Sequence, residues 1–181
     1  MTREKIVNQT KIWLTSFIIP YNICPFASQV NQQGKIHYSV IESKKIDQCL
    51  EAIFTEYQRL DIQHEIETTL VIFPHQFPLF IDYLDFLDLA ESLLIDQNYE
   101  GVYQLASFHP NYCFKGEDIS DPANYTNRSP YPMLHLIRES SLELALQSYP
   151  NPELIPERNI KLTRELGLQK IQAILNNIKQ R

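Results

Sequence analysis

Apolar residues follow two different spacings along this chain. Residues 45–60 and residues 78–94 carry them at helical spacing. Residues 36–41 alternate in polarity, residues 67–74 form a continuous apolar and β-branched run, and residues 101–108 have the composition of a further strand. Helices repeat apolar positions every three to four residues, whereas strands alternate or, when covered on both faces, are apolar throughout. The pattern therefore predicts the order strand, helix, strand, helix, strand.

This order predicts an α/β fold, because strands separated by crossover helices usually run parallel. We expect a single compact domain over residues 1–181, with a small, three- to four-stranded, mostly parallel sheet and packed helices. An α+β fold with a ferredoxin-like mixed sheet is the alternative. Helical spacing also predicts a first helix that is capped by Thr2 and ended by Pro20, and a final helix through Ile178.

The longest segment without a regular pattern covers residues 109–131. It is far longer than the usual connection of about 4 to 6 residues. Its aromatic side chains provide apolar area to bury, so we expect an ordered loop that lies over the end of the sheet. These side chains are Tyr112, Phe114, Tyr125 and Tyr131. After the loop, Pro132 is expected to open a helix that reaches about Gln147.

Composition and charge narrow the functional classes. Hydrophobic residues make up 44% of the chain and charged residues 21%, which are values of globular proteins. No apolar run approaches the roughly 18 residues of a membrane span, and the net charge of -6 argues against a nucleic-acid partner, because that requires clustered Lys and Arg. Without an apolar leader or a close-spaced set of cysteines, the chain is expected to be cytoplasmic.

No cofactor or metal is expected from the motifs in the chain. There are only four glycines and no glycine-rich phosphate loop, so a nucleotide site of the Rossmann or P-loop type is excluded. The histidines, cysteines and acidic residues show no short ligand spacing such as His-x-x-x-His. The oligomeric state is not indicated by any pattern in the sequence.

Three residues are candidates for catalysis. Cys24 precedes a proline that can occupy the first turn of a short helix, where backbone amides favour the nucleophilic thiolate; the alternative is a buried, inert cysteine. His109 follows the third expected strand, and its imidazole suits proton transfer. Glu67 opens the second strand. It can pair with His109 only if these two strands run in opposite directions; otherwise the two residues lie at opposite ends.

A second set of candidate residues has the chemistry of an anion-binding site. The phrase Asn-Arg-Ser at the end of the long loop offers a guanidinium and a hydroxyl beside the free N–H groups of the expected helix start. The alternative is that Arg128 and Arg158 form structural ion pairs with Glu139 and Glu157. The predicted ligand-binding residues are Asn127, Arg128, Ser129, Tyr131, His135, Arg138 and Arg158.

Five phrases of the chain resemble one known family. They lie at residues 24–27, 67–70, 106–110, 126–135 and 155–159. Together they are similar to the bacterial family of domain of unknown function 1415, and the resemblance extends over residues 13–167. The phrase Asn-Arg-Ser-Pro-Tyr-Pro-Met-Leu-His is long enough to be specific. The resemblance implies that the five phrases belong together, and it implies no reaction.

Two functions are expected from these residues. The first is an enzyme acting on a small anionic metabolite, in which Arg128 holds the anion, His109 transfers a proton and Cys24 is the nucleophile. The alternative is a non-catalytic module whose aromatic loop, residues 109–131, binds a small ligand or a partner protein. An enzyme requires a pocket in which polar groups converge, whereas a docking module shows a flat aromatic patch.

Overall fold

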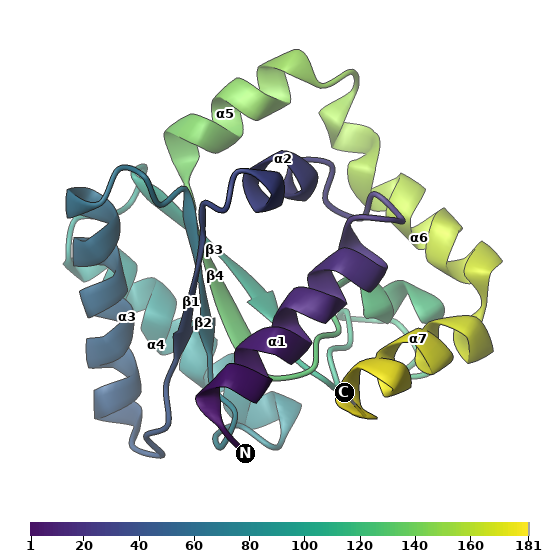
Figure 1. Ribbon diagram of the computed structural model, residues 1–181, viewed down its shortest axis with the longest axis horizontal. Helices are drawn as coiled ribbons and strands as arrows, with labels where there is room; N and C mark the ends of the chain where they lie inside the picture. The colour runs from purple at the N-terminus through teal and green to yellow at the C-terminus, as the bar shows by residue number, and fades with distance from the viewer. Residues whose placement is uncertain (181) are drawn as a thin grey trace.

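The computed structural model of the protein describes residues 1–180, which form a four-stranded sheet with helices on both faces (Figure 1). The strands lie in the order β1 (Ile36–Val40), β2 (Thr68–Ile72), β4 (Met133–Arg138) and β3 (Tyr103–Phe108). β1 and β2 are parallel, whereas β4 is antiparallel to β2 and to β3. Three of the four strands therefore point the same way. A four-stranded sheet with packed helices is confirmed. It is mixed, with β1 and β2 as its one parallel pair, and is consistent with the predicted α/β fold as well as with the α+β alternative.

Two layers of helices sandwich the sheet. The helices α3 (Ile46–Ile62) and α4 (Phe80–Asp96) cover one face, and α1 (Arg3–Trp13) and α7 (Leu168–Gln180) cover the other (Figure 1). The other helical segments are η1 (Leu14–Ile18), α2 (Ala27–Gln32), η2 (Pro122–Thr126), α5 (Glu139–Ser148), η3 (Pro152–Leu154) and α6 (Ile155–Leu166).

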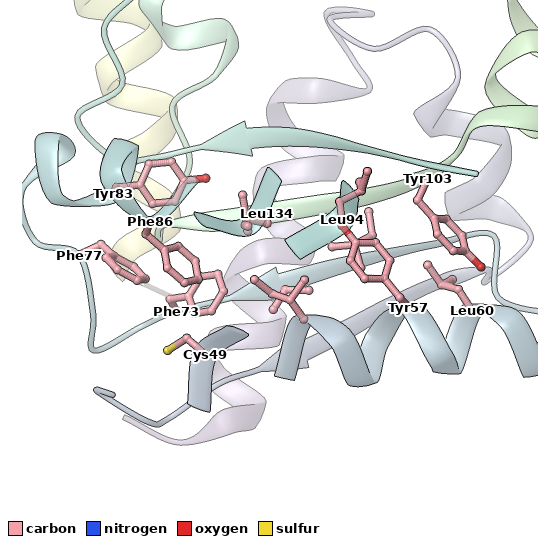
Figure 2. Packing of buried hydrophobic residues seen from close by; sticks show 14 residues of the cluster. Cys49, Tyr57, Leu60, Phe73, Phe77, Tyr83, Phe86, Leu94, Tyr103 and Leu134 are labelled. Atoms are coloured by element: carbon pink, nitrogen blue, oxygen red, sulfur yellow. The ribbon is translucent and has the colours of Figure 1, made fainter. Parts of the chain in front are cut away.

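Each face of the sheet has its own hydrophobic core. Along β4, Leu134 and Leu136 belong to the cluster with α3 and α4, whereas Met133 belongs to the cluster with α1 and α7. Figure 2 shows the first of these clusters, with Phe77 at one end and Tyr103 at the other. Every residue of β2 is buried. This explains why its sequence is apolar without alternation, since both of its faces are covered.

The segment that follows Pro132 corrects one prediction. A helix from Pro132 to about Gln147 is wrong for its first half, because the segment first forms β4 and the helix α5 begins only at Glu139. The apolar side chains of β4 also alternate between the two faces, which is strand spacing. β4 pairs with the backbone groups of β2 and β3, which would otherwise stay unpaired. Pairing with β2 and β3, which are distant in the sequence, therefore decided between the helix and the strand that the local pattern allowed.

The N-terminal helix follows the predicted pattern. The Thr2 hydroxyl accepts a hydrogen bond from the backbone N–H of Lys5 at 3.3 Å, as expected of an N-cap. The helix widens into the π-helical segment η1, where Ile19 N–H donates to the Leu14 carbonyl at 2.9 Å. It ends before Pro20, as predicted.

The long loop at residues 109–131 has a defined structure over the end of the sheet. Asn124 holds its middle, because Oδ1 accepts from Phe114 N–H at 2.9 Å and Nδ2 donates to the Asp118 carbonyl at 2.8 Å. On the outside, Arg164 of α6 donates to Asp121 Oδ2 at 2.8 Å. The prediction of an ordered, packed loop is confirmed.

Two buried tyrosines of the first core provide a test of these contacts. The Tyr83 hydroxyl donates to the Met133 carbonyl at 2.6 Å and accepts from Phe108 N–H at 3.3 Å. Tyr83→Phe should therefore lower the free energy of unfolding by about 1–3 kcal/mol, because it strands buried backbone groups. The matched control is Tyr57→Phe, since the Tyr57 hydroxyl is buried without a hydrogen-bond partner among residues 1–180. Urea unfolding should show no loss for this control; an equal loss in both variants would contradict the assignment.

Candidate functional site

Glu67 and His109 lie at opposite ends of the sheet. Glu67 directly precedes β2, and His109 directly follows β3. Both strands are antiparallel to β4, so they run in the same direction. Thr68 pairs with Ile137 near the end of β4, whereas Phe108 pairs with the first residue of β4. Of the two arrangements left open by the sequence, the one that pairs Glu67 with His109 is excluded.

His109 is enclosed, with both ring nitrogens engaged. Nδ1 accepts a hydrogen bond from Asn111 N–H at 3.0 Å, so Nε2 carries the hydrogen and donates to the Phe77 carbonyl at 2.8 Å. The rings of Phe80 and Tyr83 each lie 5.2 Å from the imidazole. Burial lowers the pKa of His109, against the opposite effect of its bond to Phe77. The imidazole therefore stays neutral, and neither nitrogen is available to a ligand in this conformation.

Arg128 connects distant parts of the long loop. Its Nε donates to the Tyr112 carbonyl at 2.9 Å and its Nη2 to the Ile119 carbonyl at 2.7 Å. The guanidinium lies over the ring of Tyr125, 4.4 Å from the centroid, and the Arg128 carbonyl accepts from Trp13 Nε1 at 3.0 Å. The side chain is buried. The helix start that was expected beside Arg128 is replaced by β4.

Arg138 is engaged in a similar way at the other end of the sheet. Its Nη2 donates to the Leu60 carbonyl at 2.5 Å and to the Ile66 carbonyl at 3.1 Å. These bonds fasten the end of α3 to β4. The guanidinium also lies 5.8 Å from the centroid of the Tyr103 ring. Arg138 therefore joins structural elements and does not point into a pocket that the structure shows.

Arg158 lines a pocket. The pocket has a volume of about 320 Å³, and we call it the basic pocket; its wall consists of Tyr21, Asn22, Arg158, Lys161, Leu162 and Glu165. The guanidinium is held by Tyr149, whose hydroxyl accepts from Nη1 at 3.0 Å, by Asn159 Oδ1 at 2.8 Å and by the Asn22 carbonyl. Lys161 and Glu165 are 4.0 Å apart and largely exposed, so their ion pair is weak.

Within residues 1–180, none of these three arginines has an acidic partner. The ion pairs among residues 1–180 involve Arg59, Arg164, Lys161 and His37. The alternative in which Arg128 and Arg158 pair with Glu139 and Glu157 is therefore not found. Neutral carbonyls and rings satisfy the N–H groups but do not neutralise the charge. The positive charges of Arg128 and Arg158 are therefore not neutralised by a carboxylate within residues 1–180.

The Arg158 guanidinium binds the carbonyl of Asn22, two residues before Cys24. The backbone amides of Phe26 and Ala27 and the positive charge of Arg158 act on the Cys24 thiol. All three interactions favour the thiolate. Burial has the larger effect, however, and raises the pKa of the thiol. The expectation that the helix start lowers this pKa is corrected, because loss of water outweighs the amides of α2, which begins at Ala27.

One ring nitrogen of His135 has no hydrogen-bond partner among the described residues. The Thr68 hydroxyl donates to the Leu136 carbonyl at 2.5 Å. His135 Nε2, which is 2.6 Å from Thr68 Oγ1, must therefore carry the hydrogen and donate it to that oxygen. Nδ1 keeps its lone pair, and no residue within the described chain donates to it. Burial lowers the pKa of His135 to about 4, so the ring is a neutral acceptor on the face of the sheet.

The remaining predicted ligand-binding residues hold the loop in place. Asn127 Nδ2 donates to the Ser107 carbonyl at 3.1 Å, and Ser129 Oγ donates to the Tyr131 carbonyl at 2.5 Å. The Tyr131 hydroxyl donates to Gln9 of α1. The polar groups of this phrase therefore connect the loop with the sheet and the first helix.

The structure brings Arg158 to the segment that contains Cys24, through its hydrogen bond to the Asn22 carbonyl, and its charge acts on the Cys24 thiol. It does not bring His109 to either of them. Lys161 was missed by the sequence reasoning, although it lies three residues after Arg158 on α6 and so shares its helix face. Two basic residues three positions apart on a predicted helix indicate a local positive patch, and this spacing could have identified the basic pocket.

Residues 1–180 contain no group of three or more His, Cys, Asp or Glu side chains placed to hold a metal ion. None of their helices has both the length and the apolar character needed to cross a membrane.

The lowered pKa of His135 has a consequence for stability. The unfolded chain takes up a proton near the ordinary pKa of 6.5, whereas the native state takes it up only near about 4. Stability is therefore complete above pH 6.5 and falls as the pH is lowered towards 4, by up to about 1.4 kcal/mol per pH unit. His135→Gln can still donate to Thr68 but cannot titrate, so urea unfolding at pH 7 and pH 5 should show a smaller difference than in the wild type. An unchanged pH dependence would assign the effect to other groups.

Comparison with known proteins assigns the chain to a family. A family model described as Protein of unknown function (DUF1415) matches residues 5–173 of the 181. The comparison with curated proteins gave no match, and neither did the comparison with solved structures. The matched range contains all four strands, the long loop, Cys24 and Arg158. The chain therefore belongs to the DUF1415 family.

Proposed function

We propose that the protein is an enzyme that binds a small anionic metabolite in the basic pocket, with Cys24, two residues after Asn22 of the pocket wall, as the reactive group. The position of Arg158 is the observation that carries this proposal. Arg158 lies in the wall of the pocket, has no acidic partner within residues 1–180, and acts electrostatically on the Cys24 thiol. The Arg158 guanidinium can therefore attract an anionic ligand and also stabilise the Cys24 thiolate.

The pocket offers charge in two forms. Arg158 is fixed by its bonds to Asn22, Tyr149 and Asn159, so its charge is held in place before a ligand arrives. Lys161 is exposed and loosely paired, and its ammonium can turn towards a bound anion. Water screens the exposed ammonium, so Lys161 adds only a modest attraction to that of the fixed Arg158 charge. Together the two charges favour an anion over a neutral molecule of the same size.

The chemistry available to Cys24 is nucleophilic attack by its thiolate. Burial raises the pKa of the thiol, so the reactive form is scarce at neutral pH and increases as the pH rises. The N–H groups of Phe26 and Ala27 and the charge of Arg158 stabilise the thiolate once it forms. An electrophilic carbon of a metabolite whose anionic group is held at Lys161 is the target that this arrangement supports.

The aromatic loop does not support the alternative of a docking module equally well. Tyr125 and Tyr131 are buried. The rings of Tyr112 and Phe114 are half-buried and pack edge to face at 5.0 Å. The aromatic side chains of the loop therefore face one another and the core, and the flat exposed patch that a docking surface requires is missing from this part of the structure.

Inorganic phosphate is a direct probe of the basic pocket. Phosphate should raise the melting temperature of the wild type, because a ligand at about 100 times its dissociation constant adds about 2.7 kcal/mol to stability. Lys161→Gln should weaken this effect severalfold without changing the melting temperature of the free protein, since Lys161 is exposed. Lys45→Gln, at the exposed start of α3 on the other side of the sheet, is the matched control. If phosphate has no effect, or affects all three proteins equally, the pocket does not bind anions.

Alkylation rates test the role of Cys24. Labelling by iodoacetamide, followed by mass spectrometry, should become faster for Cys24 as the pH rises and slower when phosphate is present. Cys113, in the long loop, is the internal control, and phosphate should leave its rate unchanged. Cys49 is completely buried and should react slowest. Labelling of Cys49 as fast as Cys24, or no protection of Cys24 by phosphate, would remove Cys24 from the site.

A further inference from the structure

A second pocket lies between the long loop and α7, and we call it the loop pocket. Its volume is about 270 Å³. The apolar part of its wall is formed by Pro110, Pro130 and Leu175, and the polar part includes Tyr125, Gln172 and Asn176. These residues come from both ends of the loop and from the C-terminal helix. No residue of the basic pocket takes part, so this site is independent of the function proposed above.

The Tyr125 hydroxyl is an unused donor in this pocket. Gln172 Nε2 donates to the Tyr125 oxygen at 3.1 Å, so the phenolic hydrogen must point elsewhere. No second hydrogen bond of this hydroxyl is found among the described residues. The bond between Gln172 and Tyr125 joins two residues of the pocket wall, which places the hydroxyl at the pocket. Asn176 is exposed on the same helix and can add an amide donor.

The pocket also has a positive charge behind it. The Arg128 guanidinium lies 4.4 Å from the centroid of the Tyr125 ring and has no acidic partner within residues 1–180. Its N–H groups bind carbonyls of the loop, so it acts through the ring and does not contact a ligand directly. None of the wall residues carries a charge. The charge of Arg128 therefore lies behind the Tyr125 ring, while the residues of the pocket wall are uncharged.

We infer that the loop pocket binds a small carboxylic acid with an apolar body. The carboxylate accepts hydrogen bonds from the Tyr125 hydroxyl and the Asn176 amide, and the body packs against Pro110, Pro130 and Leu175. A volume slightly below the usual range of about 300–1,000 Å³ limits the ligand to a small molecule. Phosphate fits less well, because desolvating its higher charge requires several direct cationic donors. Arg128 is a positioning residue of this site.

Benzoate is a suitable probe, with benzyl alcohol as its neutral analogue. Titration calorimetry should detect benzoate binding and clearly weaker binding of benzyl alcohol. Tyr125→Phe keeps the ring over Arg128 but removes the donor, so it should weaken benzoate binding about tenfold. The melting temperature of this variant verifies that it is folded. If benzoate does not bind at up to about 10 mM, or binds Tyr125→Phe equally well, the inference is wrong.

Substitutions at two neighbouring asparagines of α7 distinguish a charge effect in the pocket wall from a general effect of added negative charge on benzoate binding. Asn176→Asp places a negative charge in the wall and should abolish benzoate binding. Asn177→Asp makes the same change of charge at the next exposed position, outside the wall, and should leave binding nearly intact. Equal losses in the two variants would contradict a site at Asn176. Lys161→Gln should not affect benzoate, so failure of this inference can be distinguished from failure of the basic pocket.

Discussion

The insertion of β4 between β2 and β3 is the interaction on which the rest of the structure depends. Its residues pair with Thr68–Ile72 on one side and with Tyr103–Phe108 on the other. Because its side chains alternate, Leu134 contributes to the core under α3 and α4, and Met133 contributes to the core under α1 and α7. The long loop ends where β4 begins, with the Pro132 carbonyl accepting from Phe73 N–H at 2.9 Å. Sheet, loop and both cores are therefore coupled through one strand.

Three arginines join separate segments around the sheet by donating hydrogen bonds to backbone carbonyls. Arg128 connects the two ends of the loop, and Arg138 connects the end of α3 to β4. Arg158 joins α6 to the segment that contains Cys24. Carbonyls accept the hydrogen bonds without supplying a negative charge. The same contacts that stabilise the fold thus leave positive charge in the wall of the basic pocket and behind Tyr125 in the loop pocket, and both functional inferences rest on that charge.

Local patterns were sufficient for most of the elements. The continuous apolar run of β2 indicated a strand covered on both faces, and the helical spacing after it indicated α4. The segment at residues 133–138 was different, because Leu134 and Ile137 fit a helix while its alternation fits a strand. Its backbone pairs with residues that lie 25 to 69 positions earlier in the chain. Hydrogen bonding over such distances is not encoded in a local pattern, so the helix prediction failed there.

The sequence by itself determined which side chains carry chemistry, and it indicated a thiol at Cys24, arginines suited to an anion and an ordered aromatic loop. The tertiary structure alone decided which of them meet. It directed both nitrogens of His109 to backbone groups, separated Glu67 from His109 by the length of the sheet, and bound Arg158 to the segment that contains Cys24. It also reversed the expected shift in the pKa of Cys24, because burial is a property of the packed neighbours, whereas the helix start is a property of the local chain.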